Sequence, residues 1–338
     1  MDTRLTALSK WLTDDLQLSV TSINPASADA SFRRYFRVTI DAQTPSQKTP
    51  LPTTFIVMDS PPEHEDNVLF SRCTEILSQR TLNVPTIFET NFSQGFLILK
   101  DLGTDVYQQA LTHETADALY SDAMQALLQM QAATPEQDIA IYSDTKIQEE
   151  MQLFEEWYIG KYHQRSLTRD EQSSLKSITD TLTQNATEQP QVLVHRDYHC
   201  RNLLVTPDNN PGIIDYQDMV IGPITYDLVS IFKDCYIEWP SIQVQNWSKQ
   251  FQQKSLALGI HQITDTELWQ RWFDWMGAQR HLKVLGIFSR LFFRDGKDQY
   301  LNDLPLTYKY LLNVCHQYQE LAPLADILMR YPVKNITQ

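Results

Sequence analysis

Short apolar runs and helically spaced apolar residues divide this chain into two parts of different character. Aromatic and β-branched runs predict strands at 32–40, 54–59, 84–89 and 95–99. Helical apolar spacing predicts helices over 1–20 and 64–80, and then over most of the chain beyond residue 104. We therefore expect an α+β protein with a small β-rich N-terminal lobe (1–103) and a larger, mostly helical C-terminal lobe (104–338).

One stretch inside the helical part departs from helical spacing. It runs from Gln191 to Asp227 and contains the pattern H-x-D-x-x-x-x-N, from His195 through Asp197 to Asn202. Two short apolar runs, 203–205 and 213–214, flank a turn rich in Pro, Asn and Gly, and this order predicts an antiparallel β-hairpin. Asn202 precedes one strand and Asp215 follows the other, so we expect the two residues to lie side by side.

The chemistry of these three residues points to phosphoryl transfer. Amide and carboxylate oxygens are ligands that Mg²⁺ accepts, and Mg²⁺ completes its shell with phosphate oxygens and water. Asn202 and Asp215 would supply two such oxygens, while Asp197 is a separate carboxylate one loop away. Metal-assisted phosphoryl transfer requires this combination.

Composition excludes several classes of partner and indicates the cell compartment. The 338 residues are 42% hydrophobic and 21% charged, with a net charge of −14. Nucleic-acid binders usually show the opposite charge balance, and no apolar run reaches the length of a membrane span. The acid-containing N-terminus predicts an amphipathic helix and not a secretory signal, and the four scattered cysteines favour neither zinc nor disulfides. We expect a cytoplasmic protein without membrane or nucleic-acid partners, whose anionic substrates are met by local cations.

The ordered motifs resemble those of a known family. The H-x-D-x-x-x-x-N block, Ile214-Asp215, Gly222-Pro223 and Tyr226-Asp227-Leu228 are similar to the aminoglycoside phosphotransferase and choline kinase family. The resemblance implies a bilobal protein-kinase-like fold whose larger lobe contains the catalytic β-hairpin. It also implies Asp197 as catalytic base, Asn202 and Asp215 as Mg²⁺ ligands, and ATP as phosphoryl donor.

Longer segments narrow this resemblance, which covers nearly the whole chain. They are similar to the anomeric N-acetylmuramate/N-acetylglucosamine kinases of bacterial cell-wall recycling, and include 29–37, 57–62, 95–103, 228–236 and 279–288. This similarity implies transfer of phosphate to the C1 hydroxyl of a free N-acetylated sugar, which gives the sugar 1-phosphate for peptidoglycan recycling. We expect a small-molecule sugar substrate, ATP and Mg²⁺, and a monomeric protein.

The nucleotide-binding half departs from the kinase pattern. Residues 21–40 contain no glycine, Met58 stands where a strand lysine is expected, and Phe70 stands near the expected helix glutamate, with Glu75 as a fallback. We expect Arg33 or Arg34 to contact the ATP phosphates instead. The family resemblance places the adenine contacts on the segment Leu99, Lys100 and Asp101.

Several residues are candidates for binding the sugar. Tyr198, His199 and Arg201 lie within the catalytic loop, and Arg201 suits either an anionic ligand or a salt bridge to a surface acid. Arg280 and Lys283 form a basic pair at helical spacing, suited either to the lactyl carboxylate of N-acetylmuramate or a phosphate, or to a solvated helix face.

Four more residues are candidates for roles in or around the site. Glu156 and Trp157 belong to a helix whose aromatic residues suit the core, although these two could reach a sugar. His195 and Asp227 are expected to support the catalytic loop without touching substrate.

Two other functions remain open on sequence grounds. A kinase of the same fold could act on an aminoglycoside, choline or homoserine. A catalytically inactive nucleotide-binding protein would account for the missing lysine and glutamate, although the retention of Asp197, Asn202 and Asp215 argues against it.

Overall fold

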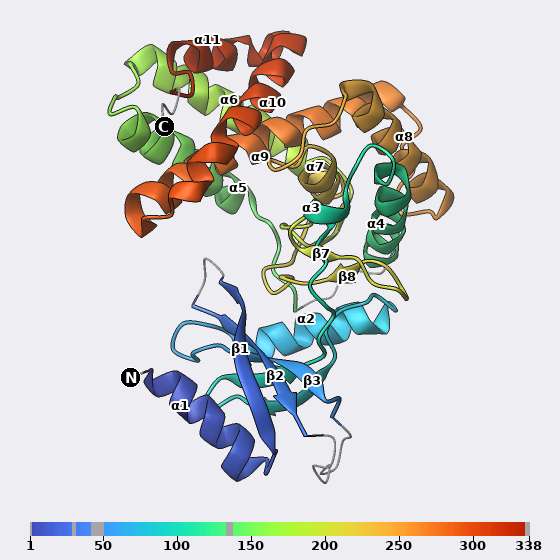
Figure 1. Cartoon of the computed structure of the whole chain (residues 1–338). Coiled ribbons are helices and arrows are strands. Elements are labelled where there is room, and N and C mark those ends of the chain that lie inside the picture. Colours follow the sequence, from blue (N-terminus) through green and yellow to red (C-terminus); the bar gives the residue numbers. More distant parts are fainter. Residues whose placement is uncertain (1, 29–31, 42–50, 133–137, 335–338) are drawn as a thin grey trace. The chain divides into compact units, whose positions relative to one another are not determined.

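The computed structural model describes residues 2–28, 32–41, 51–132 and 138–334, and it contains two compact units (Figure 1). Unit 1 comprises Met1–Ala110 and Leu203–Gln217, and unit 2 comprises Leu111–Asn202 and Asp218–Gln338. This division differs from the expected boundary at residue 103. The units separate after Ala110, and the hairpin that we assigned to the C-terminal lobe groups with unit 1.

Unit 1 is built on an antiparallel sheet with the strand order β1-β2-β3-β5-β4 in its described residues. The strands are β1 Val20–Ala28, β2 Arg34–Ile40, β3 Thr54–Asp59, β4 Ile87–Asn91 and β5 Phe96–Leu99. The aromatic and β-branched runs predicted all of them except β1. That strand is rich in Ser, Ala, Asn and Thr, so it lacks an apolar alternation and takes its conformation from pairing with β2 at the sheet edge.

The N-terminal helix is fastened to this sheet by both apolar and ionic contacts. Helix α1 (Thr3–Lys10) continues into the π-helical turn η1 (Trp11–Asp15). Their apolar side chains share a core with β2, β3 and β5, formed by Leu8, Trp11, Leu12, Phe36, Val38, Val57 and Ile98 among others. Arg4 and Arg34 both bind the fully buried carboxylate of Asp59, with Nε–Oδ distances of 2.7 and 3.0 Å.

The predicted β-hairpin is present, as β7 (Leu203–Leu204) and β8 (Gly212–Ile213), with Leu203 paired to Ile213. Backbone hydrogen bonds join it to the rest of unit 1. The Val205 N–H donates to the Asp105 carbonyl at 2.7 Å, and the Ile213 N–H donates to the Asn83 carbonyl at 2.8 Å. These bonds explain why the hairpin belongs to unit 1. Helices α2 (Asn67–Gln79) and α3 (Tyr107–Ala110) complete that unit.

Unit 2 is organised around one long helix, α9 (Thr266–Asp295), which contacts helices on several sides. Its neighbours are α5 Asp144–Leu153, the π-helical η2 Phe154–Tyr162, α6 Arg169–Thr187, α7 Tyr226–Phe232, α8 Ser241–Ala257, η3 Asp298–Asp303 and α10 Leu304–Gln317. The remaining elements are α4 Ala116–Gln131, β6 Gln191–Val194, β9 Val220–Pro223, η4 Gln319–Leu321 and α11 Ala322–Arg330.

The sequence pattern predicted that this part of the chain is mostly helical. Helix α6 starts with a capping box, in which Thr168 and Glu171 bond each other's backbone. Two elements depart from the expected helical pattern of this part of the chain. Helix α7 begins at Tyr226 and ends at Phe232, and Asp234 turns the chain after it by accepting the N–H of Tyr236 at 3.1 Å. Strand β9 was not expected, and it pairs with β6.

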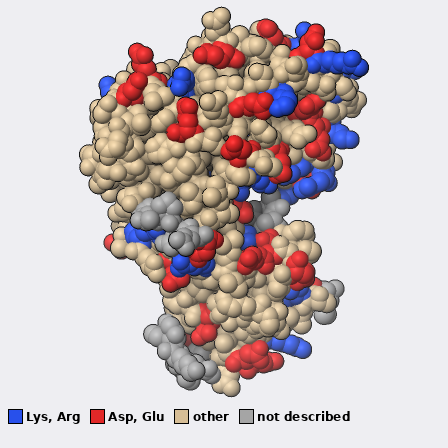
Figure 2. All heavy atoms as spheres, turned by 180° about the vertical axis from the view of Figure 1, so that it is seen from behind, with Lys and Arg blue, Asp and Glu red and all other residues tan. Residues whose placement is uncertain are grey.

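Acidic and basic side chains are interspersed on the face of the molecule shown in Figure 2. All four cysteines are buried free thiols. Among the described residues, no helix has both the length and the apolar character required to cross a membrane.

Gly286 of α9 lies close against the backbone of another helix, and this contact gives the first test. A Cβ at this position would lie 2.4 Å from the backbone carbon of Leu153, where α5 ends. A Cβ at Gly277 would instead make ordinary van der Waals contacts with the side chains of Lys233, at 3.6 Å, and Val229, at 3.8 Å. We expect Gly286→Ala to lower the free energy of unfolding by about 1–3 kcal/mol through overpacking. Gly277→Ala, the matched control on the same helix, should be neutral or stabilising by up to about 1 kcal/mol. Urea titrations followed by circular dichroism measure both, and equal effects would contradict this packing.

Candidate active site

The catalytic loop between β6 and β7 has a strained backbone that is held at several points. Arg196 has a φ of +76°, in the left-handed region that a long side chain seldom adopts. The fully buried carboxylate of Asp227 accepts the N–H groups of His195 at 2.7 Å and Arg196 at 3.0 Å. Burial raises the pKa of Asp227 to about 7, against the lowering effect of these two donors. Asp227 and the ring of His195, whose Nδ1 accepts the N–H of Asp197 at 3.3 Å, therefore support the loop.

Asp197 projects from this loop as a partly exposed carboxylate. The backbone carbonyl of Asp197 accepts hydrogen bonds from the His199 N–H and from the Asn202 side-chain amide, both at 3.0 Å, so the loop folds back on itself. The carboxylate is 41% exposed and lies 3.7 Å from the Arg280 guanidinium. Burial acts to raise the pKa of Asp197, but the positive charges of Arg280 and Lys283 outweigh it and hold this pKa well below its ordinary value. Asp197 is therefore an ionised acceptor at neutral pH.

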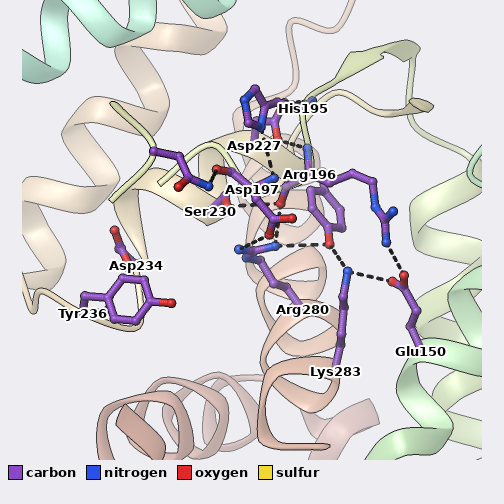
Figure 3. Close-up of polar contacts among 12 residues, drawn as sticks. Glu150, His195, Arg196, Asp197, Asp227, Ser230, Asp234, Tyr236, Arg280 and Lys283 are labelled. Atoms are coloured by element: carbon purple, nitrogen blue, oxygen red, sulfur yellow. Dashed lines mark hydrogen bonds and ion pairs between the residues drawn. The ribbon is translucent and has the colours of Figure 1, made fainter. Parts of the chain in front are cut away.

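Glu150 of α5 is the buried counterion of the site (Figure 3). It is only 6% exposed, and it binds the Arg196 guanidinium, the Tyr142 hydroxyl and, at 2.9 Å, the Lys283 ammonium. Burial acts to raise the pKa of Glu150, but Lys283 and Arg196 lower it, with a net lowering. The Glu150 carboxylate of α5 therefore positions two side chains. One belongs to Arg196, the residue before Asp197, and the other to Lys283 of α9.

Tyr226 and Arg280 complete this network. The Tyr226 hydroxyl accepts hydrogen bonds from Lys283 at 3.0 Å and Arg280 at 3.2 Å, and Arg280 also donates to the Arg196 carbonyl at 2.8 Å. Arg280 and Lys283 are each only 6% exposed. Three cations (Arg196, Arg280 and Lys283) here face the two carboxylates of Glu150 and Asp197, so positive charge is in excess beside Asp197.

Asp234 and Tyr236 lie on the far side of Asp197 from Glu150 (Figure 3). The Arg201 guanidinium stacks 3.4 Å above the centre of the Tyr236 ring, and its ion pair with Asp303 is long, at 3.9 Å. Asp234 accepts the Cys200 N–H at 3.0 Å, which ties the loop to the segment after α7. The site thus combines an ionised carboxylate, an excess of positive charge and a more accessible polar side.

Residues 22–264 match the model of the phosphotransferase enzyme family, which covers most of the chain. The chain belongs to this phosphotransferase family. It is 37% identical to an N-acetylmuramate/N-acetylglucosamine kinase of Pseudomonas putida over 337 residues, which cover 97% of this chain and 96% of that one. A kinase of the same name from Neisseria meningitidis serogroup B is 36% identical over 90% of this chain and 89% of its own.

Solved structures confirm the predicted protein-kinase-like α+β fold. An ADP-bound aminoglycoside phosphotransferase, APH(2'')-Ib, superposes with a TM-score of 0.56 at 16% identity, covering 96% of this chain and 99% of its own. The choline kinase LicA from Streptococcus pneumoniae gives a TM-score of 0.60 at 10% identity, covering 92% and 100%. At these identities the likeness concerns the fold alone.

Within this phosphotransferase, the structure brings Asp197, His199 and Arg280 together, and Lys283 joins them through Tyr226. Tyr198 has a different position. Its side chain is fully buried and its hydroxyl donates to the Ala123 carbonyl at 2.8 Å, so it anchors the loop on α4 and does not face a sugar.

Glu156 and Trp157 lie on η2, with Glu156 exposed and Trp157 half-buried. The structure records no hydrogen bond from either to the catalytic loop in the part of the chain that it describes. Their sugar-binding role stays a prediction.

The expected nucleotide residues of unit 1 have partners within the protein. Arg33 pairs with Glu65 at 2.7 Å and Arg34 with Asp2 and Asp59. In the segment that we expect to contact adenine, Leu99 of β5 is buried, the Lys100 N–H donates to the Thr86 carbonyl at 2.8 Å, and Asp101 binds Arg37 through two hydrogen bonds.

The missing lysine and glutamate are replaced by apolar packing. Met58 is fully buried in β3, and Phe70 of α2 stacks on Tyr216 with ring centres 5.4 Å apart. The Thr74 and Tyr216 hydroxyls are 2.9 Å apart. Glu75, the fallback glutamate, is 56% exposed and pairs with Arg72 of its own helix, so that expectation was wrong. Helix α2 therefore contacts the residue after Asp215 through aromatic rings.

The two predicted metal ligands have suitable chemistry for Mg²⁺. The Asn202 Nδ2 donates to the Asp197 carbonyl, so Oδ1 is the atom that would ligate a cation. Asp215 has a φ of +65° and accepts a hydrogen bond from Gln217 at 2.7 Å. One amide oxygen and one carboxylate fit a cation that keeps phosphate and water ligands. Asn202 belongs to unit 2 and Asp215 to unit 1.

Sequence reasoning missed Glu150, Tyr226 and Tyr236 as parts of the site. Glu150 carried a usable signal, because it shares the helical face of Ile147, Met151 and Phe154, all buried. An acid on the apolar face of a helix is rarely left without a buried partner.

Removing the Glu150 charge should destabilise the protein. The variant Glu150→Gln leaves Arg196 and Lys283 buried without their counterion, and we expect it to lower the free energy of unfolding by about 3–5 kcal/mol. The neighbouring Glu149 is 59% exposed, and its ion pair with Lys146 is long, at 3.7 Å. Glu149→Gln is therefore a matched control. Its effect should stay within about 0.5 kcal/mol. Chemical denaturation compares the two, and similar stabilities would show that Glu150 is not a required counterion.

Proposed function

We propose that this phosphotransferase is a sugar kinase, which transfers the γ-phosphoryl group of ATP to the C1 hydroxyl of N-acetylmuramate or N-acetylglucosamine. The product would be the sugar 1-phosphate, formed in peptidoglycan recycling. The observation that carries the proposal is the near full-length identity of 36–37% to kinases named for these two sugars. The ionised Asp197, held in a loop with excess positive charge, supports the chemistry.

The proposed reaction is a direct in-line displacement without a covalent enzyme intermediate. The C1 oxygen forms a bond to the γ-phosphorus as the bond from that phosphorus to the β-bridging oxygen breaks, and ADP leaves. Asp197 orients the C1 hydroxyl and accepts its proton, which later passes to solvent. Arg280, at 3.7 Å from Asp197, stabilises negative charge that builds up on the transferred group.

The donor side of the proposal rests on the family resemblance. ATP would be held in unit 1 by Arg33 or Arg34 near the phosphates and by the Leu99–Asp101 backbone near the adenine. Asn202 and Asp215 would hold Mg²⁺, which neutralises phosphate charge when bound.

The substrate class can be tested by ³¹P NMR on the purified protein with ATP, Mg²⁺ and one candidate alcohol at a time. We expect a sugar 1-phosphate signal with N-acetylmuramate, N-acetylglucosamine or both. Product only with an aminoglycoside, choline or homoserine would overturn the sugar assignment. ATP binding without turnover of any alcohol would indicate an inactive nucleotide-binding protein.

The role of Asp197 can be tested separately. Asp197→Asn keeps the size of the side chain but removes the proton acceptor, so we expect kcat to fall by about 10²–10⁴-fold while ATP affinity is retained. Asp208→Asn, in the exposed turn of the nearby hairpin, is the control and should keep normal kcat. A near-normal kcat in Asp197→Asn, measured by a coupled ADP assay, would exclude Asp197 as the base.

A further inference from the structure

Arg290 of α9 is a half-buried cation to which the protein gives no direct partner. Among the described residues it makes no hydrogen bond or ion pair, and its Nε is buried without an acceptor. Burial lowers the pKa of Arg290, and the positive charge of Arg294 adds to this effect. A guanidinium keeps its charge at any physiological pH. The cost of burying this cation is therefore not offset by a bound anion.

Three acids act on Arg290 through their charge, but none of them binds it. Asp295 is engaged by Arg294 through two hydrogen bonds, at 2.8 and 3.0 Å. Glu150 already binds three groups of the catalytic network. Glu156 is exposed, where water screens its charge, and it makes no hydrogen bond among the described residues. A ligand carboxylate would be the first direct partner of Arg290.

Arg290 lies on the face of α9 that carries Lys283. It follows Lys283 by seven residues, which is two helical turns or about 10 Å along the axis. Ile287 lies between them on the same face and is half-buried, so apolar surface remains exposed between the two cations. Asp197, Lys283 and Arg290 all belong to unit 2. A sugar with its C1 hydroxyl at Asp197 would extend along this face toward Arg290.

The packing of the preceding helix agrees with this position. Successive turns of α5 and η2 face successive turns of α9, with the Glu150 carboxylate 2.9 Å from the Lys283 ammonium, Leu153 against Gly286, and Glu156 acting on the charge of Arg290. The two segments therefore run in the same direction, and η2 lies beside Arg290. Because Glu150 also acts on Arg290 through its charge, the guanidinium is within electrostatic range of the catalytic network.

The other cations considered for an anionic group of the substrate are already engaged. Arg280 and Lys283 are buried, and each is held by at least two partners inside the protein. Moving either toward a ligand would break these contacts and leave a buried group uncompensated. Arg201 contacts the Tyr236 ring and Asp303. Arg290 has no such contact to lose.

Near neutral pH the two proposed sugars differ in one ionised group. N-acetylmuramate carries a lactyl ether that ends in a carboxylate, and N-acetylglucosamine has a hydroxyl there. We propose that Arg290 binds this lactyl carboxylate and thereby sets the preference of the enzyme between the two sugars. The inference rests on the proposed function. It supplies the anion that Arg290 lacks within the protein.

The test is the ratio of kcat/KM for N-acetylmuramate to kcat/KM for N-acetylglucosamine. A charge-assisted contact predicts that Arg290→Gln lowers this ratio about 10–100-fold. Arg290→Lys keeps the charge but loses the planar fork, so it should recover only part of the ratio. Glu156→Gln removes a negative charge that repels the carboxylate and should raise the ratio.

Arg271→Gln is the matched control. Arg271 lies near the other end of α9, its Nε is likewise buried without an acceptor, and it pairs with Glu188 at 3.6 Å. Its replacement removes the same charge from the same helix, far from Asp197, and should leave the ratio unchanged.

The methyl ester of N-acetylmuramate provides a second readout, because it keeps the lactyl group but carries no charge. The unmodified protein should have a kcat/KM about 10–100-fold lower for the ester than for the acid. In Arg290→Gln this difference should disappear. Turnover of ester and acid with equal kcat/KM by the unmodified protein would contradict a carboxylate contact.

The remaining outcomes separate this inference from the proposed function. Equal losses for both sugars in Arg290→Gln, or no loss for either, would overturn the inference, as would a fall of the ratio in Glu156→Gln. Turnover of N-acetylglucosamine alone by the unmodified protein would also overturn it and leave the sugar kinase assignment standing. Absence of turnover of both sugars would instead overturn that assignment. Thermal melting of each variant confirms that the compared proteins are folded.

Discussion

The buried ion pair between Glu150 and Arg196 is the contact on which the geometry of the catalytic loop depends. Arg196 occupies a left-handed conformation, which costs about 1–3 kcal/mol for such a residue and persists only where its surroundings impose it. Here the surroundings hold the residue at three points. Asp227 accepts its backbone N–H, Arg280 donates to its carbonyl, and Glu150 binds its guanidinium. The direction of the next residue, Asp197, follows from these three restraints.

A cluster of buried charges is a poor way to stabilise a protein, because desolvation offsets most of the attraction between the ions. The cluster is better explained by what it provides at the site. Its cations hold Asp197 ionised and leave positive charge in excess where phosphate charge must be accommodated. In a chain with a net charge of −14, such a local excess has to be built from selected residues, because the overall field repels anions.

The sequence predicted the parts of this protein that depend on local patterns. Apolar spacing or short motifs account for strands β2 to β5 of unit 1, helix α6, the hairpin after Asn202 and the motif containing Asp197. Strand β1 did not, because its register comes from β2. Glu150, Tyr226 and Arg280 are separated by 54–130 residues in the chain, and only the packing of α5, α7 and α9 brings them together. Tertiary contacts of this kind leave at most an indirect trace, such as an acid on an apolar helix face.

The two sides of Asp197 therefore have different constraints. On the side of Glu150, each cation of the network has at least two buried partners, so a substitution there disturbs the loop and the charge of Asp197 together. On the side of Tyr236, Arg201 contacts the Tyr236 ring and Asp303, and neither of these two residues is among the groups described above that hold Arg196. A phosphotransferase can alter its acceptor only where changes leave the reacting groups in place. The Arg201 side meets that condition, as does Arg290, which has no hydrogen bond or ion pair in the described chain, and the network around Glu150 does not.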